Sequence, residues 1–102
     1  MNTDNLITHS RARFEHVAAK KILKEKYQGK MIFAYNGGMW QAGPPLLTLL
    51  QACPVNDDIV IIDLYENPVK VNPLELQSLA LDRWQEQMNA WLVDYEELSK
   101  KR

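Results

Sequence analysis

The sequence predicts one α+β domain with the element order α-β-β-α-β-β-α, and three observations lead to this prediction. An Asn-Gly pair at residues 36–37 lies between two short apolar and aromatic runs, which is a strong local signal of a β-hairpin. A second apolar, β-branched run, "DIVIIDLY", is followed by the turn "ENP" and the short run "VKV". A helical pattern precedes the first hairpin, a second one separates the two hairpins, and a third follows the second hairpin. The 102 residues, of which 46% are hydrophobic and 25% charged, suffice for one modest core.

The first helix is expected to begin at Ser10 and to include "SRARFEHVAAKKILKEKYQG". Ser10 suits the N-cap, alanines and straight-chain residues favour the helix, and Gly29 suits its end. Residues 1–9 are expected to form a flexible N-terminal lead to a single domain over residues 10–102. Helical spacing gives this helix one apolar stripe, made by Phe14, Val17, Ala18 and Ile22. Its basic residues fall largely off the stripe, so we expect them to be solvated.

The first hairpin is expected to pair "KMIFAY" with "MWQA" through a type I′ turn, which needs positive φ at both central residues. Both faces of "KMIFAY" are apolar or nearly so, which predicts a sheet covered on both sides. "GPPLLTLLQA" then predicts a short helix entered through a proline. Its leucines leave little polar face, so this helix is predicted to be buried.

The glycines of "NGGMWQAG" raise the question of a phosphate-binding loop. Gly38 and Gly43 have the spacing of a Walker motif, but Pro44 and Pro45 stand where that motif has lysine and serine or threonine. Proline also lacks the N–H that would hold an anion. The stretch is therefore interpreted as a turn and a helix start.

The last helix is expected to run from Pro73 towards Lys100. Asn72 suits its N-cap, proline suits its first position, and Glu75 is placed to close a capping box. About 28 residues at about 1.5 Å each make a helix of about 42 Å. Spacings of three and four alternate along a heptad seam made by Leu74, Gln77, Leu81, Trp84, Met88, Trp91, Tyr95 and Leu98.

Such a helix is longer than the roughly 30 Å diameter of a compact small domain, so something must cover the rest of the seam. Either the first helix packs antiparallel along all of it, or helix 73–100 projects and a protein partner or a second copy covers its distal half. Tryptophan and tyrosine are frequent at interface hot spots. The candidate partner-binding residues are therefore Trp84, Met88, Trp91, Tyr95 and Leu98. A membrane-surface helix is disfavoured because the polar face is acidic.

The charge is uneven along the chain. Residues 1–51 carry seven Lys and Arg against three acids, whereas residues 52–102 carry five against ten. The basic helix 11–30 therefore supplies an alternative function, in which a phosphate backbone is bound by Arg13, Lys20, Lys21 and Lys24. The aromatic residues are not interleaved with these cations, and the whole chain is slightly acidic, with a net charge of −1. An acidic protein surface, including the chain's own C-terminal half, suits the basic helix better.

No catalytic, cofactor or metal constellation is visible in the sequence. His9 and His16 are its only histidines, and their spacing of seven differs from the i, i+4 spacing of helical metal ligands. Cys53 is the only cysteine, which excludes an internal disulfide. Asp63 interrupts an apolar run, and we expect a polar-face position, an ion pair with the first helix, or a catalytic acid if a pocket surrounds it. Without a nucleophile motif, no enzyme is predicted.

No run approaches the roughly 18 apolar residues of a membrane span, and "MNTDNLITHS" lacks the pattern of a signal peptide. A cytoplasmic protein without a membrane partner is therefore expected.

In "RARFEHVAAKKILKEKY" and "DLYENPVKVNPLELQSLALDRWQEQMNAWLVDYEEL" the chain resembles small proteins of large tailed bacteriophages. The resemblance lies in a compact body, the "YENPVKV" hairpin and the tryptophan-rich terminal helix. It implies a virion-assembly or accessory role through protein contacts, in the host cytoplasm or the virion. Together, these observations predict a non-enzymatic protein–protein interaction module, a structural or assembly component that docks through the C-terminal seam. The alternative is a nucleic-acid accessory factor that uses helix 11–30.

Overall fold

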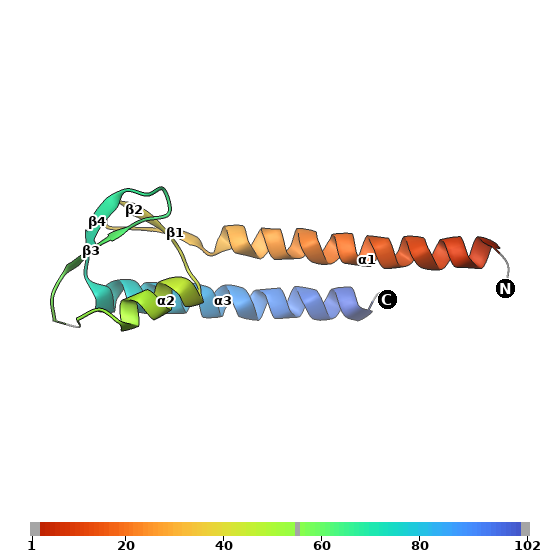
Figure 1. The fold of residues 1–102 in the computed structure, drawn as a ribbon. Coiled ribbons are helices and arrows are strands. Elements are labelled where there is room, and N and C mark those ends of the chain that lie inside the picture. Colours follow the sequence, from red (N-terminus) through yellow and green to blue (C-terminus); the bar gives the residue numbers. More distant parts are fainter. Residues whose placement is uncertain (1–2, 55, 101–102) are drawn as a thin grey trace.

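The computed structural model describes residues 3–54 and 56–100, with side chains from residue 13 onwards. Its elements follow the predicted order: α1 (Thr3–Lys30), β1 (Ile32–Tyr35), β2 (Gly38–Gln41), α2 (Pro44–Gln51), β3 (Ile59–Ile62), β4 (Pro68–Val71) and α3 (Pro73–Lys100). In Figure 1, α1 and α3 lie side by side and run in opposite directions, with α2 and both hairpins gathered at one end. The molecule is elongated, measuring 68 × 24 × 21 Å. We call residues 31–83 the head and the paired stretches 13–30 and 84–100 the helical arm.

Helix α1 begins at Thr3, earlier than the predicted start at Ser10. Residues 3–9, expected to form a flexible lead, are therefore helical, while residues 1 and 2 lie outside the described residues. The stretch "TDNLITH" contains no glycine or proline, so no strong helix breaker precedes Ser10. A serine inside a helix costs only about 0.5 kcal/mol relative to alanine, so Ser10 does not force a boundary.

Helix α1 packs on α3 through a different face from its apolar stripe. Tyr27 is buried and Leu23 is half-buried on the packed face. On the stripe, Phe14, Val17 and Ile22 are 74%, 60% and 66% exposed. The apolar stripe therefore did not determine which face of α1 packs on α3. The packed face is the one from which Tyr27 reaches Trp91 and Asp94 of α3.

The first hairpin turns at Asn36 and Gly37 as predicted. Their φ values of 51° and 83° have the sign that a type I′ turn requires at both central positions. Tyr35 is paired with Gly38, so the loop contains only these two residues. The ring of Trp40 lies over Gly38, where an added Cβ would come within 3.0 Å of it, and its indole N–H donates to the carbonyl oxygen of Tyr35 at 2.9 Å. This ring therefore closes the hairpin from one side.

Only one face of this hairpin is buried. Phe33 and Trp40 are cross-strand neighbours and enter the core, whereas Ala34 on the opposite face is exposed. The prediction of a sheet covered on both sides is therefore wrong. The prediction of a buried α2 is also wrong, because Leu50 is its one buried residue and Leu49 is exposed. Helices α2 and α3 lie on one side of the hairpins (Figure 1), and a chain of this length has no further element to cover the other side.

Asp63 joins the two hairpins. Strand β3 ends at Ile62, so Asp63 begins the loop, and it is only 7% exposed. Its carboxylate accepts the backbone N–H groups of Met39 at 3.0 Å, Tyr65 at 3.1 Å and Asn67 at 2.9 Å. The bond from the Met39 N–H has the largest effect, and together these bonds lower the pKa of the Asp63 carboxyl. The predictions of a polar strand position and of an ion pair with the first helix are wrong, because unpaired backbone donors converge on this carboxylate.

The predicted cap of α3 is confirmed. The side-chain oxygen of Asn72 accepts the N–H groups of Leu74 at 3.0 Å and Glu75 at 3.2 Å. The carboxylate of Glu75, expected to close a capping box, instead accepts the hydroxyl of Tyr35 at 3.0 Å. The start of α3 is thereby linked to the end of β1.

The first half of α3 buries a different row from the predicted heptad seam. Leu74 and Leu81 are exposed, whereas Leu76 and Ala80 are fully buried. An α-helix has 3.6 residues per turn, so a strict heptad row drifts around it, and the head approaches α3 along an i, i+4 row instead. The resulting core also gathers side chains from all parts of the head: Met31, Phe33, Trp40, Ala42, Leu50 and Val71.

Candidate functional site: a groove between the head and the helical arm

Helix α1 covers part of the seam in which the sequence placed the partner-binding residues. Trp91 stacks on Tyr27, with ring centroids 6.0 Å apart and ring planes at 7°. Lys20 lies over the ring of Tyr95, its ammonium 6.0 Å from the centroid. Of the two packing alternatives, the structure has the antiparallel pairing of the first and last helices (Figure 1). The seam is consequently half-buried at Trp84, Met88, Trp91 and Leu98, and Tyr95 is 41% exposed.

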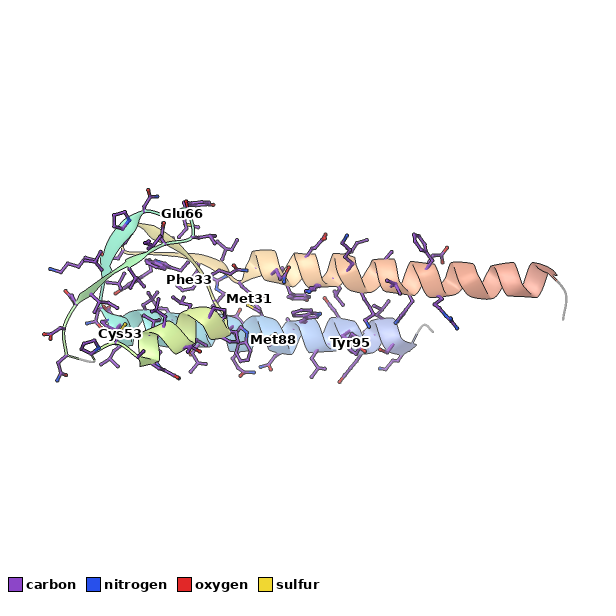
Figure 2. The ribbon with its side chains drawn as sticks, viewed as in Figure 1. Met31, Phe33, Cys53, Glu66, Met88 and Tyr95 are labelled. Carbon is purple, nitrogen blue, oxygen red and sulfur yellow. The ribbon has the colours of Figure 1, made fainter. Side chains whose placement is uncertain are left out.

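A polar cluster sets the rotation of α1 against α3. The hydroxyl of Tyr27 donates to the carboxylate of Asp94, and Lys26 forms an ion pair with the same group at 3.3 Å. The bonds from Tyr27 and Lys26 lower the pKa of Asp94, and the bond to Asp94 raises the pKa of Lys26. Figure 2 shows the side chains that fill the space between the two helices. The cluster and the ring stack together hold the arm closed.

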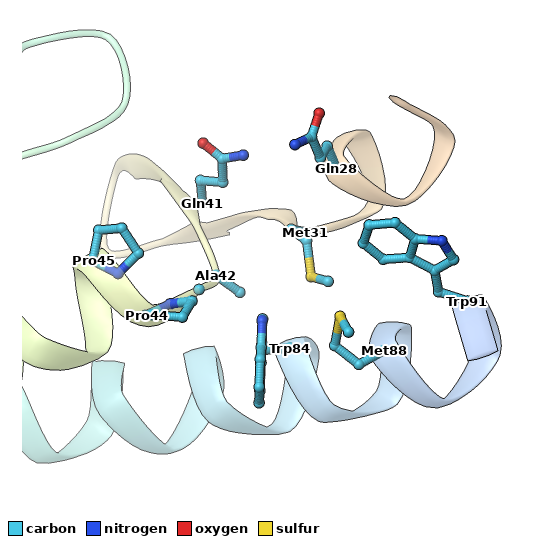
Figure 3. Close-up of a pocket in the computed structure, with 10 residues that line it drawn as sticks. Gln28, Met31, Gln41, Ala42, Pro44, Pro45, Trp84, Met88 and Trp91 are labelled. Carbon is cyan, nitrogen blue, oxygen red and sulfur yellow. The ribbon is translucent and has the colours of Figure 1, made fainter. Parts of the chain in front are cut away.

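A groove of about 290 Å³ opens where the arm meets the head (Figure 3). Helix α3 supplies one wall, and the segment that leads from β2 into α2 supplies the other. The residues that line it are Gln28, Met31, Gln41, Ala42, Gly43, Pro44, Pro45, Trp84, Met88 and Trp91. Three of the five predicted partner-binding residues therefore share one cavity. Tyr95 and Leu98 lie further along the arm, outside it.

The chemistry of the groove is apolar with a few polar groups at its edge. Met31 and Met88 point toward each other across the floor, and the amides of Gln28 and Gln41 stand at the rim (Figure 3). Within the described part of the chain, no hydrogen bond engages the indole N–H of Trp84. None of the lining residues titrates near neutral pH. The groove can therefore accept an apolar side chain and offer hydrogen bonds to the groups around it.

The sequence interpretation missed half of this groove. It treated Gly43, Pro44 and Pro45 only as a helix start, and Met31 only as a strand residue. The available signal in the sequence was a pair of adjacent prolines, which lack backbone donors, four residues after Trp40. Sequence alone could not show that this segment lies opposite Trp84, more than a third of the chain away.

The basic residues of α1 do not join the groove. Arg13, Lys20, Lys21 and Lys24 are all exposed, as predicted. In the part of the chain that the structure describes, no ion pair engages any of the four. They are distributed along the arm, and Lys20 contacts α3 through the ring of Tyr95.

A second, polar cavity of about 360 Å³ lies in the head, between the hairpins and the start of α3. Its lining comprises Tyr35, Asn36, Asp58, Lys70, Val71, Asn72 and Glu75. The bond from Tyr35 to Glu75 and burial raise the pKa of the tyrosine, burial having the larger effect. The side-chain amide of Asn36 donates to the carbonyl oxygen of Lys70. These contacts link the two hairpins to each other and β1 to α3.

The remaining candidate residues show no site in the described residues. Cys53 is half-buried and its thiol donates to the carbonyl oxygen of Leu49 at 3.2 Å. The side chain of His9 lies outside the described residues. Among residues 13–54 and 56–100, no group of three or more metal-ligating side chains is placed to hold an ion, and no helix in the described part has the length and apolarity needed to cross a membrane. No protein-family model, curated protein or solved structure matches this chain.

Proposed function

We propose that this protein is a non-enzymatic protein–protein interaction module that binds a partner through the C-terminal helix, at the groove between head and arm. The observation that carries the proposal is the shared cavity of Trp84, Met88 and Trp91. At about 290 Å³ it lies at the lower end of the range of ligand sites, roughly 300–1,000 Å³. It suits an apolar anchor side chain of a protein partner, the type of contact that dominates interface energies.

The composition of the groove supports binding over chemistry. Its residues are methionine, tryptophan, proline, glutamine and small residues, none of which provides a general acid or base near neutral pH. Methionine is common at binding surfaces because its unbranched chain adapts to different partners. The rim amides of Gln28 and Gln41 would hydrogen-bond the backbone on either side of the anchor.

The test is selection of peptides from a display library on the full-length chain, followed by affinity measurement with purified peptides. Selected peptides should carry a bulky apolar residue and should quench or shift the fluorescence of Trp84 and Trp91. Gln41→Arg places a cation at the rim and should weaken binding at least about tenfold. Gln51→Arg, an exposed glutamine at the end of α2, is the matched control and should bind like the wild type.

Urea unfolding of both variants must first show wild-type stability, since Gln41 also lies in β2. Peptides that bind the wild type and Gln41→Arg with equal affinity would place the binding surface elsewhere and refute the proposal.

A further inference from the structure

The turn of the first hairpin carries a chemically reactive pair, Asn36 and Gly37. An asparagine deamidates when the backbone nitrogen of the next residue attacks its side-chain amide, and glycine favours this attack because it has no Cβ to obstruct it. The chain has six other asparagines, none of which precedes glycine: Asn2, Asn5, Asn56, Asn67, Asn72 and Asn89. Asn67 and Asn72 precede prolines, whose nitrogen carries no hydrogen and does not react in this way. The sequence therefore favours the reaction most at Asn36.

The fold uses the same side-chain amide as a tether between the two hairpins. Nδ2 of Asn36 donates to the carbonyl oxygen of Lys70 in β4. Asn36 and Gly37 are both exposed, so water reaches the turn. The polar cavity beside the turn is also lined by Asp58 and Glu75. The nitrogen atom that links the first hairpin to β4 is thus the atom that deamidation removes.

We propose that Asn36 is a site of spontaneous deamidation and that the reaction releases the turn of the first hairpin from β4. The backbone nitrogen of Gly37 loses its proton and forms a bond to Cγ of Asn36. The Cγ–Nδ2 bond breaks, and Nδ2 leaves as ammonia. Water then opens the resulting five-membered succinimide ring at either of its two carbonyl groups. One opening gives aspartate, and the other gives isoaspartate, in which Cβ has become part of the backbone.

Both products lose the bond to Lys70. An ionised carboxylate has no hydrogen to donate, so it faces the carbonyl oxygen of Lys70 without a bond. It also adds a negative charge to a cavity whose lining already includes two acids, Asp58 and Glu75, against one lysine. Isoaspartate lengthens the backbone by one atom, which a type I′ loop of two residues does not accommodate. The bond from the Met39 N–H to Asp63 remains, so we expect a loosened head rather than an unfolded one.

The site is tested by incubating the folded full-length chain in mildly alkaline buffer, which promotes loss of the proton from the Gly37 nitrogen. Peptide mass spectrometry detects deamidation as a gain of one mass unit, and an isoaspartyl methyltransferase labels the isoaspartate fraction. Conversion at Asn36 should be several-fold faster than at Asn56 and Asn89, two exposed asparagines that do not precede glycine. Gly37→Ala should slow the conversion several-fold although it loosens the hairpin, because the added Cβ obstructs the attack. Conversion at Asn36 no faster than at Asn56 and Asn89 would refute the site.

The consequence is tested with Asn36→Asp, which has the sequence of the aspartate product. Its unfolding equilibrium constant in urea should exceed that of the wild type by at least about fivefold, because one hydrogen bond is lost. Asn56→Asp is the matched control: it adds the same charge at an exposed asparagine and should unfold like the wild type. Equal stability of the two variants would refute the coupling of the modification to the hairpins. The groove does not include Asn36, so these results are independent of the proposed function.

Discussion

Tyr27 and Trp91 stack with ring centroids 6.0 Å apart and ring planes within 7° of parallel. They are far apart in sequence, and the contact joins the last turns of α1 to the distal half of α3. Tyr27 also donates to Asp94, one helical turn from Trp91. One residue of α1 thus makes an aromatic and a polar contact with the same stretch of α3, and its stacking partner Trp91 lines the groove.

Trp91→Ala should loosen the arm. We expect a loss of about 2 kcal/mol in the free energy of unfolding, below the roughly 3–5 kcal/mol of a fully buried tryptophan, because Trp91 is half-buried. Urea unfolding followed by circular dichroism measures this. Leu79→Ala, at an exposed position of the same helix, should change stability by no more than about 0.5 kcal/mol. Equal losses in the two variants would show that the stack does not hold the arm.

Leu76 and Leu74 provide a matched pair for the register of α3. Leu76 is 0% exposed and Leu74 is 51% exposed, although the heptad seam predicted Leu74 as the packed residue. Leu76→Ala should cost about 2–5 kcal/mol because it leaves a cavity in the core. Leu74→Ala should cost less than about 1 kcal/mol. Chemical unfolding distinguishes the two, and the reverse order would support the heptad seam over the observed packing.

Two glycines should respond to alanine in opposite directions. Gly37 has a φ of 83°, so Gly37→Ala should destabilise the hairpin by about 1 kcal/mol. Gly29 lies inside α1, and an added Cβ there meets nothing within 4 Å. Gly29→Ala should therefore stabilise the protein by about 0.5–1 kcal/mol through helix propensity. Melting temperatures give the signs, and a gain in stability from Gly37→Ala would contradict the type I′ turn.

Asp63 should make stability depend on acid pH. Its pKa in the folded protein is lowered from the ordinary value of 3.8, so its contribution is complete above the unfolded pKa. The contribution is lost as pH falls through the lower folded value. In Asp63→Asn, the urea midpoint should be lower at neutral pH, because one amide oxygen must serve three N–H donors.

The same variant should lose less stability on acidification to about pH 2 than the wild type does. Some acid dependence should remain, since the pKa of Asp94 is lowered as well. Urea midpoints measured across this range provide the comparison. An acid profile of Asp63→Asn that parallels the wild type would show that this carboxylate does not link the hairpins as described.

The sequence by itself determined the element order, the turn at Asn36 and Gly37, and the cap at Asn72. Each depends on the φ range of one or two residues, or on hydrogen bonds within a few positions. The helix boundary at Ser10 was wrong because a good N-cap residue is also tolerated inside a helix.

Only the tertiary structure decided which faces pack. It turned Tyr27 towards α3 and left Phe14 exposed, gave Asp63 three backbone partners from two hairpins, and placed Pro44 opposite Trp84. A helix with apolar residues on two faces can pack through either, and the choice depends on what a distant segment offers. The groove likewise exists only where segments far apart in the chain meet, so periodicity could identify Trp84, Met88 and Trp91 but not the opposite wall.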